Sequence, residues 1–124
     1  MADQNLDTVR GAYEAFGRGD LPGVLAILAD DIAWSVPPPL PQAGDAHGRD
    51  EVGAFFQRLG ALWEDLSLEL DDFVASGDRV CVIGRGSGKV DGQQTGYGFV
   101  HAWTLANGKA VRFDEYSQPG PELL

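Results

Sequence analysis

The stretch Thr95–Gln118, TGYGFVHAWTLANGKAVRFDEYSQ, decides the fold of this chain. Two apolar, aromatic-rich runs flank Asn107-Gly108, which is the strongest short-range signal for a β-hairpin. A type I′ turn needs positive φ at both central residues, and Asn and Gly tolerate this best. A two-residue turn pairs Ala106 with Lys109 and sets the register of the whole hairpin.

Counting outward from this turn places His101 opposite Asp114 and Val100 opposite Glu115. Because side chains alternate across a strand, the hairpin then has two faces. One face is apolar with one carboxylate and holds Val100, Ala102, Thr104, Val111, Phe113, Glu115 and Ser117. The other face is aromatic and holds Tyr97, Phe99, His101, Trp103, Arg112, Asp114, Tyr116 and Gln118. A one-residue slip would change these cross-strand partners.

Length, charge and cysteine content restrict the class of protein. The 124 residues are expected to form one domain, residues 1–124, with a core that needs no metal or disulfide. Nineteen acidic and nine basic residues give a net charge of −10, which argues against nucleic acid and anionic membranes as partners. One cysteine, no signal-peptide pattern and no apolar run of about 20 residues favour a cytoplasmic protein.

Hydrophobic periodicity predicts two helices at the start of the chain. Apolar residues recur at spacings of three and four over residues 5–18, and Gly19 would end this helix. Asp20 can cap a second helix over Leu21–Ala29, with a proline in its first turn.

A short strand, a proline-rich loop and a third helix follow. Ile32–Val36 has the composition of a strand. Residues 37–48 begin with four prolines in five positions and are expected to form an ordered loop across the end of the sheet. Asp50 can cap a third helix that runs to about Trp63.

The second half of the chain predicts a strand meander. Leu66–Leu70 alternates apolar and polar residues, and the pattern breaks near Asp71-Asp72, which indicates a bulge. Arg79–Lys89 is a further strand, with alternating glycines that indicate bending or close backbone approach, at Gly84, Gly86 and Gly88. Helices first and antiparallel strands after them predict an α+β fold in which a curved sheet forms an open cone.

Three local patterns give this order a family resemblance. They are YEAFGRGDLPGVLAILADDIAW at residues 13–34, GRDEVGAFF at residues 48–56 and NGKAVRFDEY at residues 107–116. With them the chain resembles the nuclear transport factor 2-like superfamily, specifically its SnoaL-like and ketosteroid-isomerase-like domains. The resemblance covers most of the chain and implies a cystatin-like cone, a curved antiparallel sheet wrapped around three N-terminal helices.

The resemblance transfers only some of the family's catalytic residues. Ungapped alignment places the three catalytic positions of ketosteroid isomerase at Ala12, Val100 and Val36, so we do not expect that mechanism. In SnoaL-like polyketide cyclases the acid–base carboxylate lies on the last strand, and its position matches Glu115. Such domains often end in Glu-Tyr-x-Asp, whereas this chain has Gln118 in the last position, so a mechanism with two carboxylates there is not supported.

Glu115 has two interpretations. It can be a carboxylate at the floor of an apolar cone, beside Val100 and Phe113, where loss of hydration suits a general acid or base. Alternatively, it forms a salt bridge to Arg85 or Arg79 on a neighbouring strand, or it lies at the rim in water.

His101 also has two interpretations. In the working register it faces Asp114 on the convex side, which the family uses for dimer packing, and its exposed aromatic neighbours predict a homodimer through the sheet. If the sheet is bulged, His101 turns inward and pairs with the ligand. His47 and Asp45 are too few ligands for a metal site, so neither a metal nor another cofactor is expected.

These patterns predict a pocket for a small apolar metabolite, a polyketide-like, terpenoid or aromatic carbonyl compound. We expect a cofactor-free isomerase, cyclase or hydratase in which Glu115 moves a proton and Tyr13, His101 or an ordered water steadies the oxyanion. A non-catalytic ligand carrier or a protein-binding dimer is the alternative. The residues expected to line the pocket are Phe16, Trp34, Val36, Phe55, Val100 and Phe113.

Overall fold

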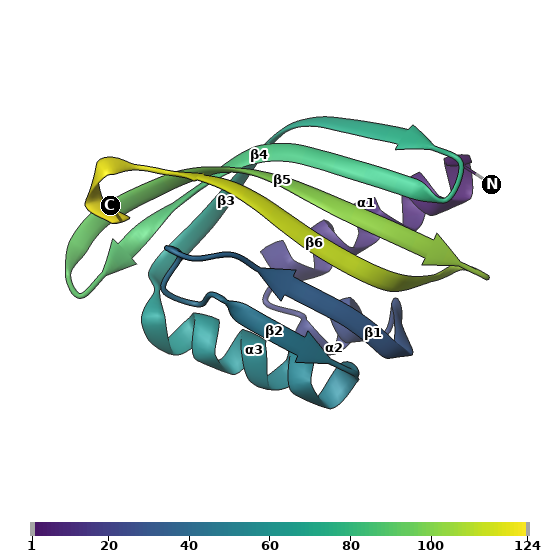
Figure 1. The fold of residues 1–124 in the computed structure, drawn as a ribbon, viewed down its shortest axis with the longest axis horizontal. Helices are drawn as coiled ribbons and strands as arrows, with labels where there is room; N and C mark the ends of the chain where they lie inside the picture. The colour runs from purple at the N-terminus through teal and green to yellow at the C-terminus, as the bar shows by residue number, and fades with distance from the viewer. Residues whose placement is uncertain (1, 124) are drawn as a thin grey trace.

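The computed structural model describes residues 2–123, in which three helices lie on the concave side of a curved six-stranded sheet (Figure 1). The α-helices are α1 (Ala2–Gly17), α2 (Leu21–Leu25) and α3 (Arg49–Leu62). The strands are β1 (Leu28–Val36), β2 (Gly44–His47), β3 (Glu64–Ser76), β4 (Arg79–Val90), β5 (Gln93–Ala106) and β6 (Lys109–Pro119), followed by a 3₁₀ turn at Pro121–Leu123. The α+β cone is confirmed.

The sheet is mixed, whereas an antiparallel sheet was expected. Its strand order is β2-β1-β6-β5-β4-β3, and β1 runs parallel to β6 while the other neighbours are antiparallel. The chain reaches β6 only after α3 and three further strands, so the first and last long strands meet side by side (Figure 1).

The predicted boundaries of all three helices differ from the structure. The first helix was expected over residues 5–18 but spans Ala2–Gly17. The second helix was expected to reach Ala29 but ends at Leu25, because the amide of Ala110 donates to the carbonyl of Ile27 at 2.8 Å and Leu28 already pairs with β6. The third helix is capped by Gly48 rather than by Asp50, without a side-chain hydrogen bond.

Two other local expectations are confirmed. The carboxylate of Asp20 accepts a hydrogen bond from the amide of Gly23 at the start of α2. The β3–β4 register shifts between Leu70 and Asp72, at the expected bulge.

The alternating glycines of β4 make room for aromatic rings. A Cβ atom at Gly86 would lie 2.5 Å from two ring carbons of Tyr97, closer than real contacts allow. The expected close approach at these glycines is confirmed. The nearest neighbour is the ring of Tyr97 at Gly86 and backbone atoms at Gly84 and Gly88.

A bulge in the β5–β6 hairpin overturns the predicted faces. Ala106 pairs with Lys109 as expected and Leu105 with Ala110, but Thr104 pairs with Arg112, so Val111 is an extra residue in β6. A bulge of this kind shifts every later pair by one position.

The shifted register places His101 opposite Glu115, and Val100 opposite Tyr116. The expected aromatic outer face is therefore wrong, because the rings of β5 turn inward while Tyr116 of β6 stays outside. Phe99 and Trp103 are buried with exposed fractions of 4% and 3%. Burying such a ring contributes roughly 1.5–3 kcal/mol, which favours the bulged register over the unbroken one.

No α-helix within residues 2–123 has both the length and the apolar character required to cross a bilayer.

Candidate functional site

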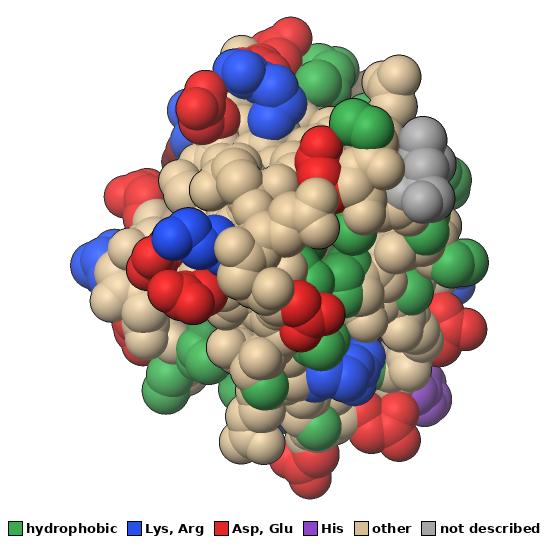
Figure 2. Space-filling view, turned by 90° about the vertical axis from the view of Figure 1, so that its left-hand side faces the viewer, with side chains coloured by type: hydrophobic (Ala, Val, Ile, Leu, Met, Phe, Trp, Pro, Cys, Tyr) green, Lys and Arg blue, Asp and Glu red, His purple; other side chains and the backbone are tan. Residues whose placement is uncertain are grey.

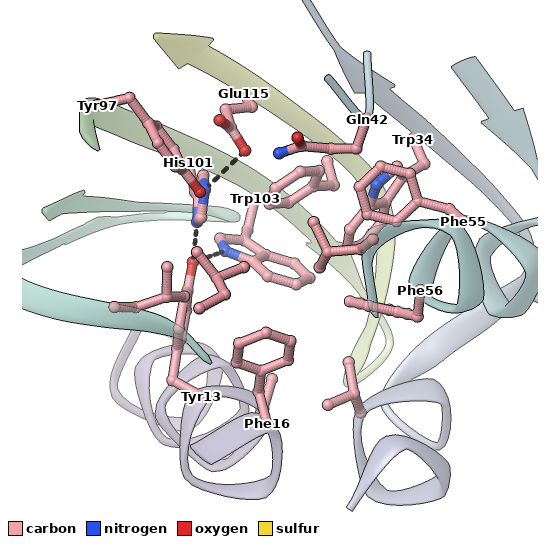
Figure 3. A pocket seen from close by; sticks show the side chains of 16 residues that line it. Tyr13, Phe16, Trp34, Gln42, Phe55, Phe56, Tyr97, His101, Trp103 and Glu115 are labelled. Atoms are coloured by element: carbon pink, nitrogen blue, oxygen red, sulfur yellow. Dashed lines mark hydrogen bonds and ion pairs between the residues drawn. The ribbon is translucent and has the colours of Figure 1, made fainter. Parts of the chain in front are cut away.

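A cavity lies between the helices and the concave face of the sheet (Figure 3). It has a free volume of about 60 Å³, or about 550 Å³ when the part open to solvent is included. A buried cavity of about 150 Å³ holds one benzene molecule, so a ligand of that size or larger would extend into the open part. The wall is mainly aromatic, with side chains from Phe16, Trp34, Phe55, Phe56, Trp103 and Phe113.

The aromatic wall is tightly packed around Trp34. Its ring stacks on that of Phe113 with centroids 3.9 Å apart, and it meets the rings of Phe55 and Trp103 at 5.7 and 5.8 Å. These contacts join β1, α3, β5 and β6, so the shape of the cavity depends on packing between distant segments.

A chain of hydrogen bonds crosses the cavity wall from β6 to α1 (Figure 3). The Oε1 atom of Glu115 lies 2.9 Å from Nε2 of His101, and Nδ1 of His101 lies 2.5 Å from the hydroxyl of Tyr13. The indole nitrogen of Trp103 donates to that hydroxyl at 3.0 Å. At the other end, Ser117 donates to Oε2 of Glu115 at 2.7 Å.

The donor in each of these bonds follows from the chemistry of the groups. An ionised Glu115 can only accept, and the indole N–H of Trp103 can only donate. A neutral His101 therefore carries its proton on Nε2 and accepts at Nδ1 from the hydroxyl of Tyr13. Both ring nitrogens of His101 are thereby occupied.

His101 therefore supports Glu115 and has no free nitrogen for a ligand. His101 is 6% exposed, and its ring stacks on that of Phe99 with centroids 3.9 Å apart and an angle of 12° between the rings. Glu115 is 8% exposed, and each of its oxygens keeps one lone pair after the bonds from His101 and Ser117.

The tyrosines of the cavity stay protonated at neutral pH. Burial raises the pKa of Tyr13 well above its usual value, although the hydrogen bond from Trp103 opposes this. Burial also raises the pKa of Tyr97, and the charge of Glu115 adds to the increase. Both side chains therefore act as neutral hydroxyl groups.

The structure brings most of the predicted site residues together. Tyr13, His101 and Glu115 line the cavity, together with four of the six residues expected to bind ligand, Phe16, Trp34, Phe55 and Phe113. Their roles in binding and catalysis stay predictions.

Val100 and Val36 do not line the cavity. The bulge turns Val100 to the convex face, and Val36 is buried at the end of β1 with 2% exposure. The proposed ion pair between Glu115 and Arg85 is also absent from residues 2–123, because Arg85 pairs with Glu69 and Asp71.

Sequence reasoning missed several cavity residues. Tyr97 and Trp103 were assigned to the outer face because the bulge was not counted. Gln42 was missed because nothing in its loop signals an inward side chain, yet it is 2% exposed and accepts a hydrogen bond from the indole of Trp63 at 2.9 Å. Within residues 2–123, no group of three His, Cys, Asp or Glu side chains has the arrangement of a metal site.

The model of the SnoaL-like domain family matches residues 9–113, which is most of the chain. This chain belongs to the SnoaL-like domain family. It is thus a member of the nuclear transport factor 2-like superfamily, as its resemblance implied.

Solved structures agree with this assignment. A nuclear transport factor 2-like protein of unknown function from Burkholderia pseudomallei is 40% identical, with a TM-score of 0.86 over 93% of this chain and 91% of that one. A similar protein from Burkholderia thailandensis is 30% identical, with a TM-score of 0.87 over 92% and 90% of the two chains.

TerC, crystallised with polyporic acid, is 25% identical, with a TM-score of 0.84 over 93% of this chain and 92% of its own. No curated protein is similar enough to count as a match. Membership of this family supports a small-molecule-binding domain, and the cavity between the helices and the sheet is partly open to solvent and has a mainly apolar lining.

Proposed function

We propose that this SnoaL-like domain binds an apolar carbonyl compound and catalyses a cofactor-free proton transfer on it, with Glu115 as the acid–base group. The supporting observation is a buried carboxylate in an aromatic cavity, held by His101 and Ser117, with one lone pair free on each oxygen. That arrangement suits a general base, because the carboxylate is oriented and poorly hydrated.

The proposed step is removal of a proton from the carbon next to a carbonyl group. The C–H bond breaks, the proton moves to Glu115, and the electron pair forms the C=C bond of an enolate. Return of the proton to another carbon gives an isomerisation. Attack of the enolate carbon on a second carbonyl forms a C–C bond and turns that carbonyl oxygen into an alkoxide, which takes the proton back from Glu115 and completes a cyclisation. His101 keeps the carboxylate in place throughout.

The substrate class follows from the wall of the cavity. Its aromatic side chains favour a flat apolar molecule, and its lining contains no lysine or arginine to neutralise an anion. The relative TerC, crystallised with the small molecule polyporic acid, supports binding of a small organic molecule.

Deuterium exchange tests this function directly. The bicyclic ketone 2-tetralone has exchangeable hydrogens beside its carbonyl group, and their loss in D₂O can be followed by NMR. We expect the protein to accelerate this exchange and Glu115→Gln to reduce the acceleration by a factor of roughly 10² or more. Glu14→Gln removes an exposed carboxylate from α1 and serves as the matched control. Full exchange in the Glu115→Gln variant would rule out Glu115 as the base.

A ligand carrier is the second candidate. It is favoured by Ala12, Val36 and Val100, which occupy the positions aligned with the catalytic residues of ketosteroid isomerase and cannot transfer protons. A carrier would bind 2-tetralone without accelerating its exchange in the unmodified protein.

We propose in addition that the convex face of the sheet forms a homodimer. Ile83, Val100 and Tyr116 are cross-strand neighbours on this face, and Ile83 and Tyr116 are 39% and 63% exposed. Native mass spectrometry should show a dimer that Ile83→Lys converts to monomer, whereas Leu70→Lys, on the other face, leaves it intact. A monomeric unmodified protein would contradict the proposal.

A further inference from the structure

The proline-rich loop contributes one buried polar side chain to the cavity, that of Gln42. The loop joins β1 to β2 and is held to α3, because Arg58 donates to the carbonyl of Gln42 at 3.1 Å. Gln42 is 2% exposed, although it comes from a loop.

The amide of Gln42 has a defined orientation. Its Oε1 atom accepts the indole N–H of Trp63 at 2.9 Å, and an indole N–H cannot accept in return. The oxygen must therefore face Trp63, which leaves the NH₂ group to face elsewhere. Figure 3 shows the amide end of Gln42 directed toward Glu115 across the cavity.

The NH₂ group of Gln42 has no hydrogen-bond partner within residues 2–123. Unlike the indole nitrogen of Trp34, this NH₂ group is not among the fully buried unpaired atoms, so it keeps accessible surface from which it can donate to an oxygen placed between Gln42 and Glu115. The sequence suggested Tyr13 or His101 for this task.

Most other polar groups of the cavity are already used. The hydroxyl proton of Tyr13 is donated to His101, and the indole N–H of Trp103 is donated to Tyr13. The indole nitrogen of Trp34 has no partner, but it is fully buried and offers no surface to a ligand. The hydroxyl of Tyr97 is a further donor without a partner among residues 2–123, but it lies over Gly86 of β4, whereas the amide of Gln42 is directed toward Glu115 (Figure 3). Gln42 is therefore the better-placed donor for an oxygen next to Glu115.

We propose that Gln42 binds the carbonyl oxygen of the substrate and stabilises the enolate that forms when Glu115 removes the adjacent proton. The assignment rests on the proposed function of Glu115. As the C–H electron pair becomes the new C=C bond, the carbonyl π electrons move to the oxygen, where the N–H of Gln42 stabilises them.

This pair of groups also narrows the substrate class. Gln42 offers a donor and Glu115 an acceptor, so the ligand must present an acceptor beside an acidic C–H group, as an uncharged ketone or aldehyde does. A carboxylate or phosphate would face Glu115 without a cation in the lining. The charge of the surface also disfavours anionic ligands. Acidic side chains outnumber basic ones on the face in Figure 2, in keeping with the net charge of −10.

The carbonyl stretching frequency of bound 2-tetralone, labelled with ¹³C at the carbonyl, tests the assignment. We expect the band to lie lower in the unmodified protein than in Gln42→Leu, because only the former donates a hydrogen bond to the oxygen. Gln42→Leu should also weaken 2-tetralone binding by roughly five- to tenfold, the effect of one hydrogen bond. Binding of tetralin, which has CH₂ in place of the carbonyl, should change by less than about twofold.

Trp63→Phe is the matched control, because Gln42→Leu also leaves Trp63 without an acceptor. Trp63→Phe removes the other half of that pair and keeps the amide donor, so it should retain the low carbonyl frequency. The double variant Gln42→Leu/Trp63→Phe serves as a second variant if Gln42→Leu does not fold, since it leaves no unpaired indole N–H and lacks the amide donor.

Two outcomes overturn the assignment: an unchanged carbonyl frequency in the Gln42 variants, or an equal loss of 2-tetralone and tetralin binding. The second would show that Gln42 only supports the cavity wall. The two measurements also separate a wrong assignment of Glu115 as the base from a wrong assignment of Gln42 as the donor. If 2-tetralone shows no accelerated exchange but its carbonyl frequency depends on Gln42, then Gln42 stands as the binding residue and Glu115 is not the base.

Discussion

In the β5–β6 hairpin, the strand register near the turn differs from the register further away from it. Near the turn, Ala106 pairs with Lys109 and Leu105 with Ala110, as the Asn-Gly dipeptide predicts. Beyond Val111 the pairing is shifted by one residue along the whole remaining length of the strands. A turn therefore determines the register of only its nearest pairs, and burial of side chains determines the rest.

Side chains further from the turn than the bulge at Val111 show what the unbroken register would lose. Trp103 and Phe99 are buried in the bulged register, whereas Tyr116 on the opposite face is 63% exposed. An unbroken ladder would leave Trp103 and His101 facing outward while Glu115 faced the core without its partner. One extra residue thus assembles the candidate site.

Deletion of Val111 should have the largest effect, because it restores the unbroken ladder. The concave residues of one strand would then face away from those of the other, so we expect loss of cooperative thermal unfolding and of dispersed NMR signals. Val111→Ala keeps the bulge and should unfold cooperatively. A folded deletion variant with the native His101 environment would show that the bulge is not needed.

Replacement of His101 by Phe should have the next largest effect. The substitution keeps the stack on Phe99 but leaves the Oε1 atom of Glu115 and the hydroxyl proton of Tyr13 without partners, at roughly 1–3 kcal/mol for each group. Urea unfolding should show a total loss of about 2–5 kcal/mol. His47→Gln, at an exposed position, should change stability by less than about 0.5 kcal/mol. Equal effects of the two variants would mean that the buried chain of hydrogen bonds contributes no stability.

A methyl group at Gly86 should have a smaller effect. Its Cβ would meet the ring of Tyr97 at 2.5 Å, so the ring must move, at a cost of about 1–3 kcal/mol. Gly98→Ala, on the neighbouring strand, has its nearest contact at 3.9 Å and should be almost neutral. The difference between the two denaturant midpoints measures how closely β4 packs against that ring, and identical midpoints would contradict the packing.

Alkaline pH should produce the smallest and most gradual change. Burial raises the pKa of Tyr13 above its usual value of 10.0, so between pH 10 and the higher native pKa the unfolded chain releases a proton that the native protein keeps. The native state then binds more protons, and the free energy of unfolding falls as pH rises above 10, with no contribution below that value. Tyr13→Phe should lose stability less steeply in that range. Parallel pH profiles would contradict burial of the Tyr13 hydroxyl.

Periodicity predicted the long elements but neither the short ones nor the strand partners. Residues 37–48 were expected to form a loop, but they contain the strand β2, which pairs with β1. The α1 helix and the long strands could be recognised because local apolar spacing reflects burial on one face. The short α2 helix and the early start of β1 depend on hydrogen bonds from β6, which is about 80 residues away in the chain, roughly the separation between Ile27 and Ala110.

The residues of the candidate site also divide into those that the local sequence reveals and those that depend on distant segments. Glu115 could be found from the sequence because a lone carboxylate interrupts an apolar face. Gln42 could not, because its inward orientation depends on Trp63 and Arg58 of the distant α3 segment.

The sequence by itself determined the α+β class, the cone, the hairpin turn and the family, since each depends on residue spacing or on a turn that needs positive φ. Only the tertiary structure decided which face of β5 is inside. Two registers satisfy the same alternating pattern, and they differ only in the rings and the Glu115–His101 pair that they bury. That burial is a property of segments brought together by folding, so no local pattern could reveal it.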